Sequence, residues 1–132
     1  MNPNAPMLTW QPPAHWTRIT TIDMHTGGEP LRVYASGLPP IEGGTVLEKR
    51  RYFREHFDHL RTGTMFEPRG HADMYGGFLV PPDDDGADLG VLFWHKDGFS
   101  TACGHGTIAL ATYAVDEGLV DATDDGETDV VI

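Results

Sequence analysis

The chain has 132 residues, a formal net charge of −11 and an apolar fraction of 39%. This length fits one domain that buries roughly two-thirds of its unfolded surface, so a true hydrophobic core is expected. The acidic charge repels phosphate backbones and anionic lipid, which argues against nucleic acid and membrane as partners.

The first part of the chain predicts a tail followed by two strands. Residues 1–16 are polar and rich in proline, with tryptophans as the only sizeable anchors. Residues 17–23 and 31–34 favour strands, and the turn residues 25–30 separate them. We therefore expect a unit of strand, tight loop and strand.

The middle of the chain predicts an amphipathic helix and a strand pair. Thr45 and Glu48 make a capping box, and apolar residues then recur near helical spacing through Arg61. After a turn that contains proline, residues 74–80 and 89–94 are apolar runs of strand length. An acidic turn separates these two runs, so we expect them to pair in antiparallel fashion.

A second helix is predicted near the end. Residues 108–115 contain no charge, and a helix that is apolar on all sides is usually buried, so we expect it inside the sheet. Gly118 is a suitable stop for it. The chain closes on an apolar, strand-like run at residues 130–132, from which we expect a truncated protein.

The cysteine content and the N-terminal residues bear on the cellular compartment. Cys103 is the one cysteine, so the chain cannot form an internal disulfide. The N-terminal residues lack the basic start and apolar run of a signal peptide, and no stretch is long enough to span a bilayer. We therefore expect a cytoplasmic protein.

The segment that carries chemistry is residues 100–107, where a lone thiol, glycines and a histidine open the apolar helix. The first-turn amides of a helix lack internal partners and carry the positive end of its dipole, which favours an anion and a thiolate. We expect Cys103 to be partly accessible and to accept a proton near neutral pH. Without side chains at Gly104 and Gly106, a substrate carboxylate should reach the amides of Gly104, His105 and Gly106. This combination suits removal of the proton next to a carboxylate.

Other interpretations of these residues stay open. A buried Cys103 would simply be a small apolar residue, as most free cysteines are. Gly104, Gly106 and Ala109 also spell the G-x-G-x-x-A pattern of a dinucleotide-binding turn, with acidic residues about 20 positions on, although the preceding segments look like hairpins. Two histidines three positions apart on the amphipathic helix lack further ligands by spacing, so we expect no metal.

Four motifs in this order resemble the proline racemase family over nearly all of residues 17–120. They are DMHTGGEP at residues 23–30, EPRGH at 67–71, DMYG at 73–76 and CGHGT at 103–107. Within that family, residues 49–59 and 65–66 look closest to the enzymes that dehydrate trans-3-hydroxy-L-proline.

The resemblance implies an α+β protein with the diaminopimelate-epimerase-like fold. In that fold each of two domains wraps a curved, mostly antiparallel sheet around a buried central helix, and the substrate lies between the two helix N-termini. Residues 17–132 would be the N-terminal catalytic domain, residues 1–16 a tail, and the second domain is absent. A homodimer of the full-length protein stays open.

The resemblance also implies a reaction without cofactor or metal. Cys103 matches the first catalytic base, and Gly104 and His105 match the substrate-carboxylate site. The expected function is α-proton abstraction from a proline-type imino acid, with dehydration of trans-3-hydroxy-L-proline as the first choice. The alternative is a proline racemase or hydroxyproline epimerase that uses a second cysteine from the missing domain. Ala102 stands where methionine is common, and the fragment alone is expected to be inactive.

Overall fold

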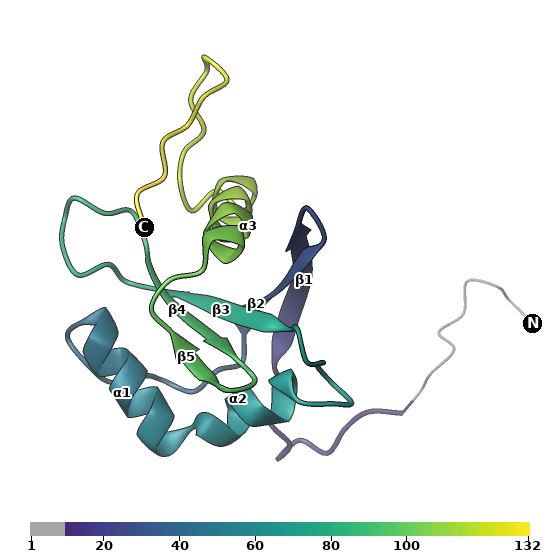
Figure 1. Ribbon diagram of the computed structural model, residues 1–132. Coiled ribbons are helices and arrows are strands. Elements are labelled where there is room, and N and C mark those ends of the chain that lie inside the picture. The colour runs from purple at the N-terminus through teal and green to yellow at the C-terminus, as the bar shows by residue number, and fades with distance from the viewer. Residues whose placement is uncertain (1–9) are drawn as a thin grey trace, which may run out of the picture.

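The computed structural model describes residues 10–132 and contains a five-stranded sheet and three helices (Figure 1). The strands follow one another in the sheet in chain order, and every neighbouring pair is antiparallel except the parallel pair β2 and β3. The predicted α+β class and mostly antiparallel sheet are confirmed. The strands are β1 (Thr20–Thr26), β2 (Glu29–Ser36), β3 (Tyr75–Val80), β4 (Gly90–His95) and β5 (Gly98–Ser100).

The helices cover both faces of the sheet. Helices α1 (Val46–His56) and α2 (Asp58–Met65) connect the two parallel strands and lie on one face, whereas α3 (Gly104–Asp116) lies on the other (Figure 1). We expected the last helix to be buried on all sides, and this expectation is wrong. The sheet is open and reaches only one side of α3, so Ile108 on the outer side is 58% exposed.

Two apolar clusters follow from the alternation of side chains along the strands. On β2, Leu31 and Val33 face α3, whereas Tyr34 faces α1 and α2. The cluster beneath α1 and α2 consists of Tyr34, Phe53, Met65, Met74, Phe78, Leu92 and Trp94. The cluster beneath α3 consists of Leu31, Val33, Phe93, Cys103, Ala109 and Leu110.

The predicted amphipathic helix is two helices. Its capping box is confirmed, because Thr45 accepts from the Glu48 amide and the Glu48 carboxylate accepts from the Thr45 amide. The helix breaks at Phe57, where the backbone leaves helical geometry. The break turns the chain so that Phe53 in α1 and Met65 in α2 both reach full burial against one face of the sheet.

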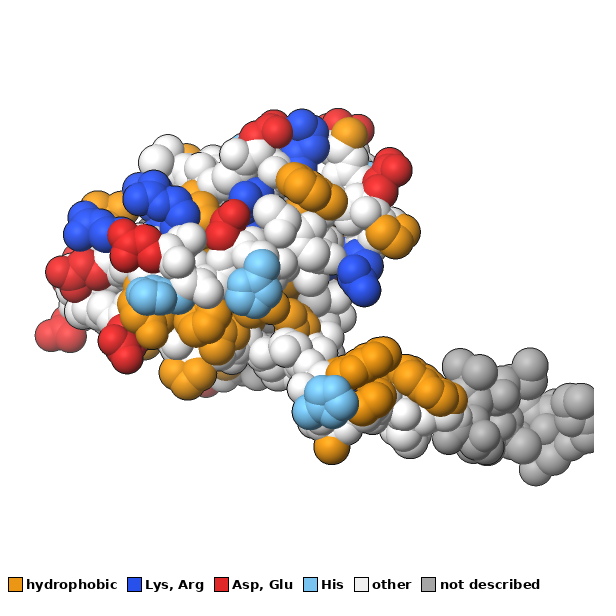
Figure 2. Space-filling view, turned by 90° about the horizontal axis from the view of Figure 1, so that it is seen from below, with side chains coloured by type: hydrophobic (Ala, Val, Ile, Leu, Met, Phe, Trp, Pro, Cys, Tyr) orange, Lys and Arg blue, Asp and Glu red, His pale blue; other side chains and the backbone are white. Residues whose placement is uncertain are grey.

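The C-terminal end of the chain differs from expectation. Residues 130–132 form no strand; instead the amides of Asp88 and Leu89 donate to the carbonyl of Val131. Residues 1–9 of the predicted tail lie outside the described residues. Trp10 and Trp16 pack edge to face on each other, and Figure 2 shows hydrophobic side chains along this projecting segment. Among residues 10–132, no helix has the length and apolar character that crossing a bilayer requires.

Candidate active site

Cys103 is the N-cap residue of α3. Its backbone is extended, with φ −150° and ψ 101°, and its carbonyl accepts the first helical hydrogen bond from the Thr107 amide at 2.8 Å. The amides of Gly104, His105 and Gly106 therefore occupy the first turn, where no helical carbonyl can accept from them. The predicted position of the cysteine at a helix N-terminus is confirmed.

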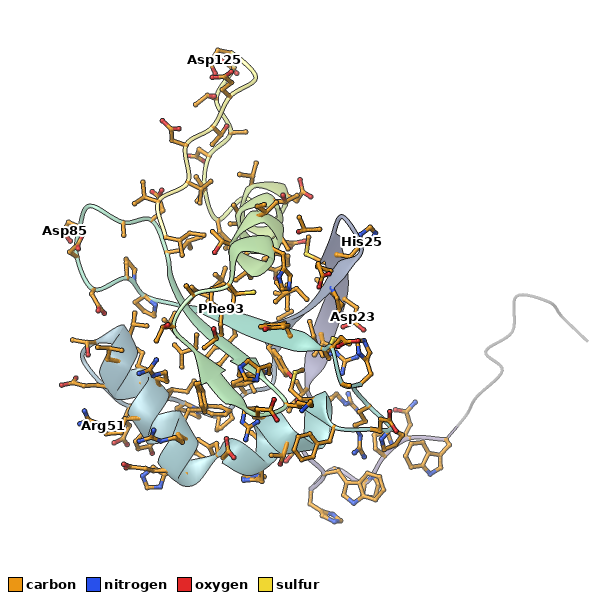
Figure 3. The ribbon with its side chains drawn as sticks, viewed as in Figure 1. Asp23, His25, Arg51, Asp85, Phe93 and Asp125 are labelled. Carbon is orange, nitrogen blue, oxygen red and sulfur yellow. The ribbon has the colours of Figure 1, made fainter. Side chains whose placement is uncertain are left out.

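The sulfur of Cys103 is more deeply placed than expected. Cys103 is only 7% exposed, so the expectation of a partly accessible thiol is wrong for this chain. The cause is the close approach of α3 to the sheet at Gly106. A Cβ atom there would lie 2.7 Å from Cε1 of Phe93, a β4 residue marked in Figure 3, and 2.9 Å from Sγ of Cys103.

Burial also acts on the ionisation of the thiol. It raises the pKa of Cys103 above the ordinary value of a thiol, because the charged form is poorly solvated there, and an interaction with the Gly106 amide lowers the pKa by less. The two effects on the pKa oppose each other, and burial is the larger.

The side chain of His105 is the polar neighbour of the sulfur. Its Nδ1 and Nε2 atoms lie 3.5 and 3.7 Å from Sγ of Cys103, so the sulfur lies over the face of the ring. The Nε2 atom also lies 3.2 Å from the carbonyl oxygen of Pro30. The ring packs edge to face on Tyr75 with centroids 4.9 Å apart. The hydroxyl of Thr26 donates to the His105 carbonyl at 2.9 Å. The β1–β2 hairpin and β3 thus hold a residue for which the sequence indicated only a backbone role.

Gly104 has a different environment from Gly106. It is exposed, and a Cβ atom on it would meet nothing within 4 Å. An incoming carboxylate can therefore approach the helix terminus from the side of Gly104. Gly106, by contrast, is buried between the helix and the sheet.

A cleft of about 690 Å³ lies next to residues that hold the His105 ring, although Cys103 is not part of its wall. Pro30 and Tyr75, which both contact the His105 ring, are part of its wall. No local pattern in the sequence predicts this cleft, because its wall comes from three separate turns. Its ionisable lining residues are Glu29, His71, Asp73, His95, Lys96 and Asp97.

The dinucleotide interpretation of Gly104, Gly106 and Ala109 is wrong. That motif requires a parallel strand crossover, whereas α3 follows the antiparallel hairpin of β4 and β5. The acidic residues expected to bind a ribose lie in the long loop after α3, and Figure 3 shows Asp125 at its far tip. Within residues 10–132, no three histidine, cysteine, aspartate or glutamate side chains gather as a metal site would require.

Comparison with known proteins places these residues in context. The sequence model of the family described as "Proline racemase" matches residues 21–132. Trans-L-3-hydroxyproline dehydratase of Xenopus tropicalis is 56% identical over 128 residues, which cover 97% of this chain and 37% of that protein. The 3-hydroxyproline 2-epimerase of Burkholderia multivorans is 51% identical over 105 residues, covering 80% of this chain and 31% of that protein.

Solved structures give the same picture. A hydroxyproline epimerase from Agrobacterium vitis, crystallised with trans-4-hydroxy-L-proline, superposes with a TM-score of 0.71 at 25% identity. The match covers 80% of this chain and 32% of the epimerase. A probable proline racemase from Agrobacterium radiobacter K84 gives a TM-score of 0.72 at 28% identity and covers 81% of this chain and 32% of its own. The chain thus spans about a third of the length of these proteins.

Proposed function

The chain belongs to the proline racemase family, as its motifs predicted, and on this premise we propose that Cys103 is the base that removes the α-proton of a proline-type imino acid. The observation that carries the proposal is the position of Cys103 as N-cap of α3, beside first-turn amides that have no helical acceptor. The open approach at Gly104 supports it, because an anionic group can reach those amides there.

In the proposed complex the substrate carboxylate binds the first turn of α3. The amides of Gly104 and His105 donate to its oxygens, and the Gly106 amide completes the turn on the side of the sulfur. Donors that are fixed before the reaction stabilise the charge that develops on the carboxylate as the α-proton leaves. The carboxylate and the sulfur then lie on the same side of the helix end.

The chemical step begins with the thiolate of Cys103. The sulfur takes the α-proton and becomes a thiol, and the electron pair of the broken C–H bond moves into the carboxylate. In trans-3-hydroxy-L-proline that pair then forms the double bond between the α- and β-carbons, and the β-hydroxyl leaves as hydroxide. A proton from the solvent converts the hydroxide to water, and the Cys103 thiol gives its proton back to the solvent to restore the thiolate. We propose this dehydration as the reaction, and dehydratases 56% identical to the chain support it.

The second candidate is epimerisation or racemisation with the same base. It is favoured by the 3-hydroxyproline 2-epimerase that is 51% identical and by the hydroxyproline epimerase structure. In that reaction a second acid returns a proton to the opposite face of the α-carbon. We propose that this second residue lies in another domain, outside the 132 residues of the chain.

The net charge and Cys103 also bear on the partner and the cellular location of the protein. We propose a small imino acid as the partner rather than nucleic acid or membrane, because the chain carries a net charge of −11. We also propose a cytoplasmic location, because Cys103 can act as a base only while it stays reduced.

The test is deuterium exchange at the α-carbon in D₂O, followed for trans-3-hydroxy-L-proline and for both enantiomers of proline. A form of the protein extended to the length of its relatives should exchange the α-proton, and Cys103→Ala should reduce the rate by about 10²–10⁴-fold. The 132-residue chain alone should give no exchange. Loss of the hydroxyl identifies the dehydratase, and the 2-epimer identifies the alternative. Exchange that is unchanged in Cys103→Ala would refute the proposal.

A further inference from the structure

Three histidine rings accept a hydrogen bond from a backbone amide through Nδ1. The acceptors are His25, His71 and His95, and the donors are the amides of Gly28, Asp73 and Asp97, each 3.1 Å away. Each donor lies two or three positions after its histidine, so each bond closes a tight turn. The turns are the β1–β2 hairpin, the turn before β3 and the β4–β5 hairpin. Figure 3 marks His25 beside the first of these turns.

The three turns come together at the cleft of about 690 Å³. At least one partner of each bond is part of the cleft wall, namely Gly28, His71, Asp73, His95 and Asp97. Residues 10–132 contain all seven histidines, and no other imidazole among them accepts from a backbone amide. Imidazole acceptors thus close the wall of this cleft at three separate points.

The donors determine the protonation state of each ring. A backbone N–H can only donate, so the Nδ1 atom that faces it must offer a lone pair. Each ring is therefore neutral, with its proton on Nε2. A charged imidazolium carries a hydrogen on both nitrogens and cannot accept. Protonation at Nδ1 therefore removes the bond, because it places two N–H groups against each other.

We propose that His25, His71 and His95 form an acid-sensitive switch in the wall of the cleft. While the rings are neutral, the three turns are closed and the wall is ordered. When the rings gain a proton, the turn bonds break and the wall becomes mobile. Each ring takes up one proton from the solvent and loses one N–H···N hydrogen bond, and no other reactant takes part. The inference stands on the turn contacts and goes beyond the proposed function.

The two hairpin turns depend on these bonds because their backbones are costly to order. Gly27 and Gly28 have φ values of 58° and 95°, and Gly98 has a φ of 145°. Glycine loses more conformational freedom on folding than any other residue. The strands beside the hairpin turns keep their own pairing, from Thr26 with Glu29 and from His95 with Gly98. The loss of order is therefore expected in the turns and not in the sheet.

Histidine is the kind of side chain near these turns that ordinarily changes charge in mild acid. The other groups that face His25 and His71 are Asp23 of β1, Glu29 and Arg32 of β2, Asp73, and His105 of α3. Those that face His95 are Arg61 of α2, Tyr75 of β3, Lys96 and Asp97. Carboxylate, tyrosine, lysine and arginine side chains ordinarily keep one charge state between pH 5 and 8. His105 is set apart, because its Nε2 faces the Pro30 carbonyl and its ring accepts from no backbone amide.

The experiment is nuclear magnetic resonance of the 132-residue chain, labelled with nitrogen-15, from about pH 8 to about pH 5. At the upper end the three rings should be in the Nε2–H form, and each Nδ1 should show a nitrogen–nitrogen coupling to the amide of Gly28, Asp73 or Asp97. Each coupling should be lost as its ring gains a proton. The backbone order parameters of these three residues should then fall from about 0.85 to below about 0.6.

Two variants keep the turn bond but remove its response to acid. In His71→Asn and His95→Asn the asparagine oxygen also accepts from the amide two residues on, and asparagine does not titrate. In each variant the turn that carries the asparagine should stay ordered at about pH 5, while the other two turns respond as in the wild type. His59→Asn is the matched control, because His59 is an exposed histidine on α2, and it should leave all three responses in place.

The wild-type spectra alone can overturn the proposal, so it does not depend on whether the variants fold. An Nδ1–H neutral ring at any of the three histidines would contradict the assigned hydrogen bonds. A coupling that persists in a charged ring, or order parameters that stay unchanged at about pH 5, would show that protonation does not open the turns.

Discussion

Arg32 on β2 binds both carboxylate oxygens of Asp23 on β1, through Nε at 2.8 Å and Nη2 at 2.9 Å. Its Nη1 atom donates to the carbonyls of Thr64 and Arg69, at 2.8 and 2.6 Å. One side chain thus joins the first hairpin to the end of α2 and to the turn before β3. That turn continues into residues 71–73, which form part of the wall of the 690 Å³ cleft.

We predict that Arg32 matters more to stability than its ion pair does. Arg32→Ala leaves the Thr64 and Arg69 carbonyls without their donor and should lower the free energy of unfolding by about 1–3 kcal/mol. Asp23→Asn should cost less than about 1 kcal/mol, because the Asp23 side chain is 56% exposed and the pair is screened by water. Urea unfolding measures the free energy of unfolding of both variants. Arg32→Lys is the control, because it keeps the positive charge but loses the planar guanidinium donors. Equal losses in Arg32→Ala and Asp23→Asn would contradict the prediction.

The same pair predicts a dependence of stability on pH. The hydrogen bond from Arg32 holds the pKa of Asp23 below its ordinary value. A depressed folded-state pKa contributes stability above the unfolded value of about 3.9, and that contribution is lost as the pH falls through the folded value. The wild-type chain should therefore lose stability more steeply than Asp23→Asn below about pH 4. Parallel curves of unfolding free energy against pH would show that Arg32 does not act on this carboxylate.

Two glycines of the same helix turn should respond in opposite ways to alanine. Gly106→Ala would place a Cβ atom 2.7 Å from Phe93 and 2.9 Å from the Cys103 sulfur, so it should destabilise the chain by about 1–3 kcal/mol. Gly104→Ala meets nothing within 4 Å and should leave the free energy of unfolding unchanged or slightly higher. Thermal unfolding followed by circular dichroism compares them directly. A neutral Gly106→Ala would mean that α3 can move away from the sheet at little cost.

Local patterns in the sequence were sufficient for much of the fold. The capping box at Thr45, the antiparallel pairing of β3 with β4 and the helix stop at Gly118 each depend on residues close together in the chain. The N-cap position of Cys103 is of the same kind, because adjacent glycines and an apolar run mark the helix start. These features need no knowledge of distant contacts.

The environment of the site could not be predicted in this way. The bond between His105 and the Pro30 carbonyl spans 75 positions, and its geometry depends on how the first hairpin lies against α3. The burial of Cys103 has a similar origin, because it is set by how closely Gly106 lets α3 approach Phe93. The break at Phe57 also reflects tertiary packing, since two helix directions are needed to bury both Phe53 and Met65.

The pKa of Cys103 gives a prediction at alkaline pH. Burial raises the pKa in the folded chain, so the folded state keeps a proton that the unfolded state loses near the ordinary thiol value of about 8.5. The stabilising contribution is fully present below that value and is lost as the pH rises through the folded pKa. The unfolding free energy of the wild-type chain should therefore fall relative to that of Cys103→Ala above about pH 8.5. The comparison removes the contributions of the tyrosines and lysines, because both chains contain them. A difference in unfolding free energy that stays constant with pH would rule the effect out.

The last prediction concerns the side chain at Gly104 and the place of the substrate carboxylate. Gly104→Val should abolish binding of pyrrole-2-carboxylate, a planar mimic of the deprotonated ring, to the protein extended to the length of its relatives. The valine would occupy the open approach to the first-turn amides, and losing two hydrogen bonds to a charged group costs about 3 kcal/mol or more, which is about a hundredfold in affinity. Stability should change little, because no atom lies within 4 Å of the added Cβ. Thr112→Val is the matched control: it places the same side chain on the exposed face of α3, away from the helix start, and should bind the mimic normally. Calorimetric titration measures the affinities, and unchanged binding in Gly104→Val would mean that the carboxylate is held elsewhere.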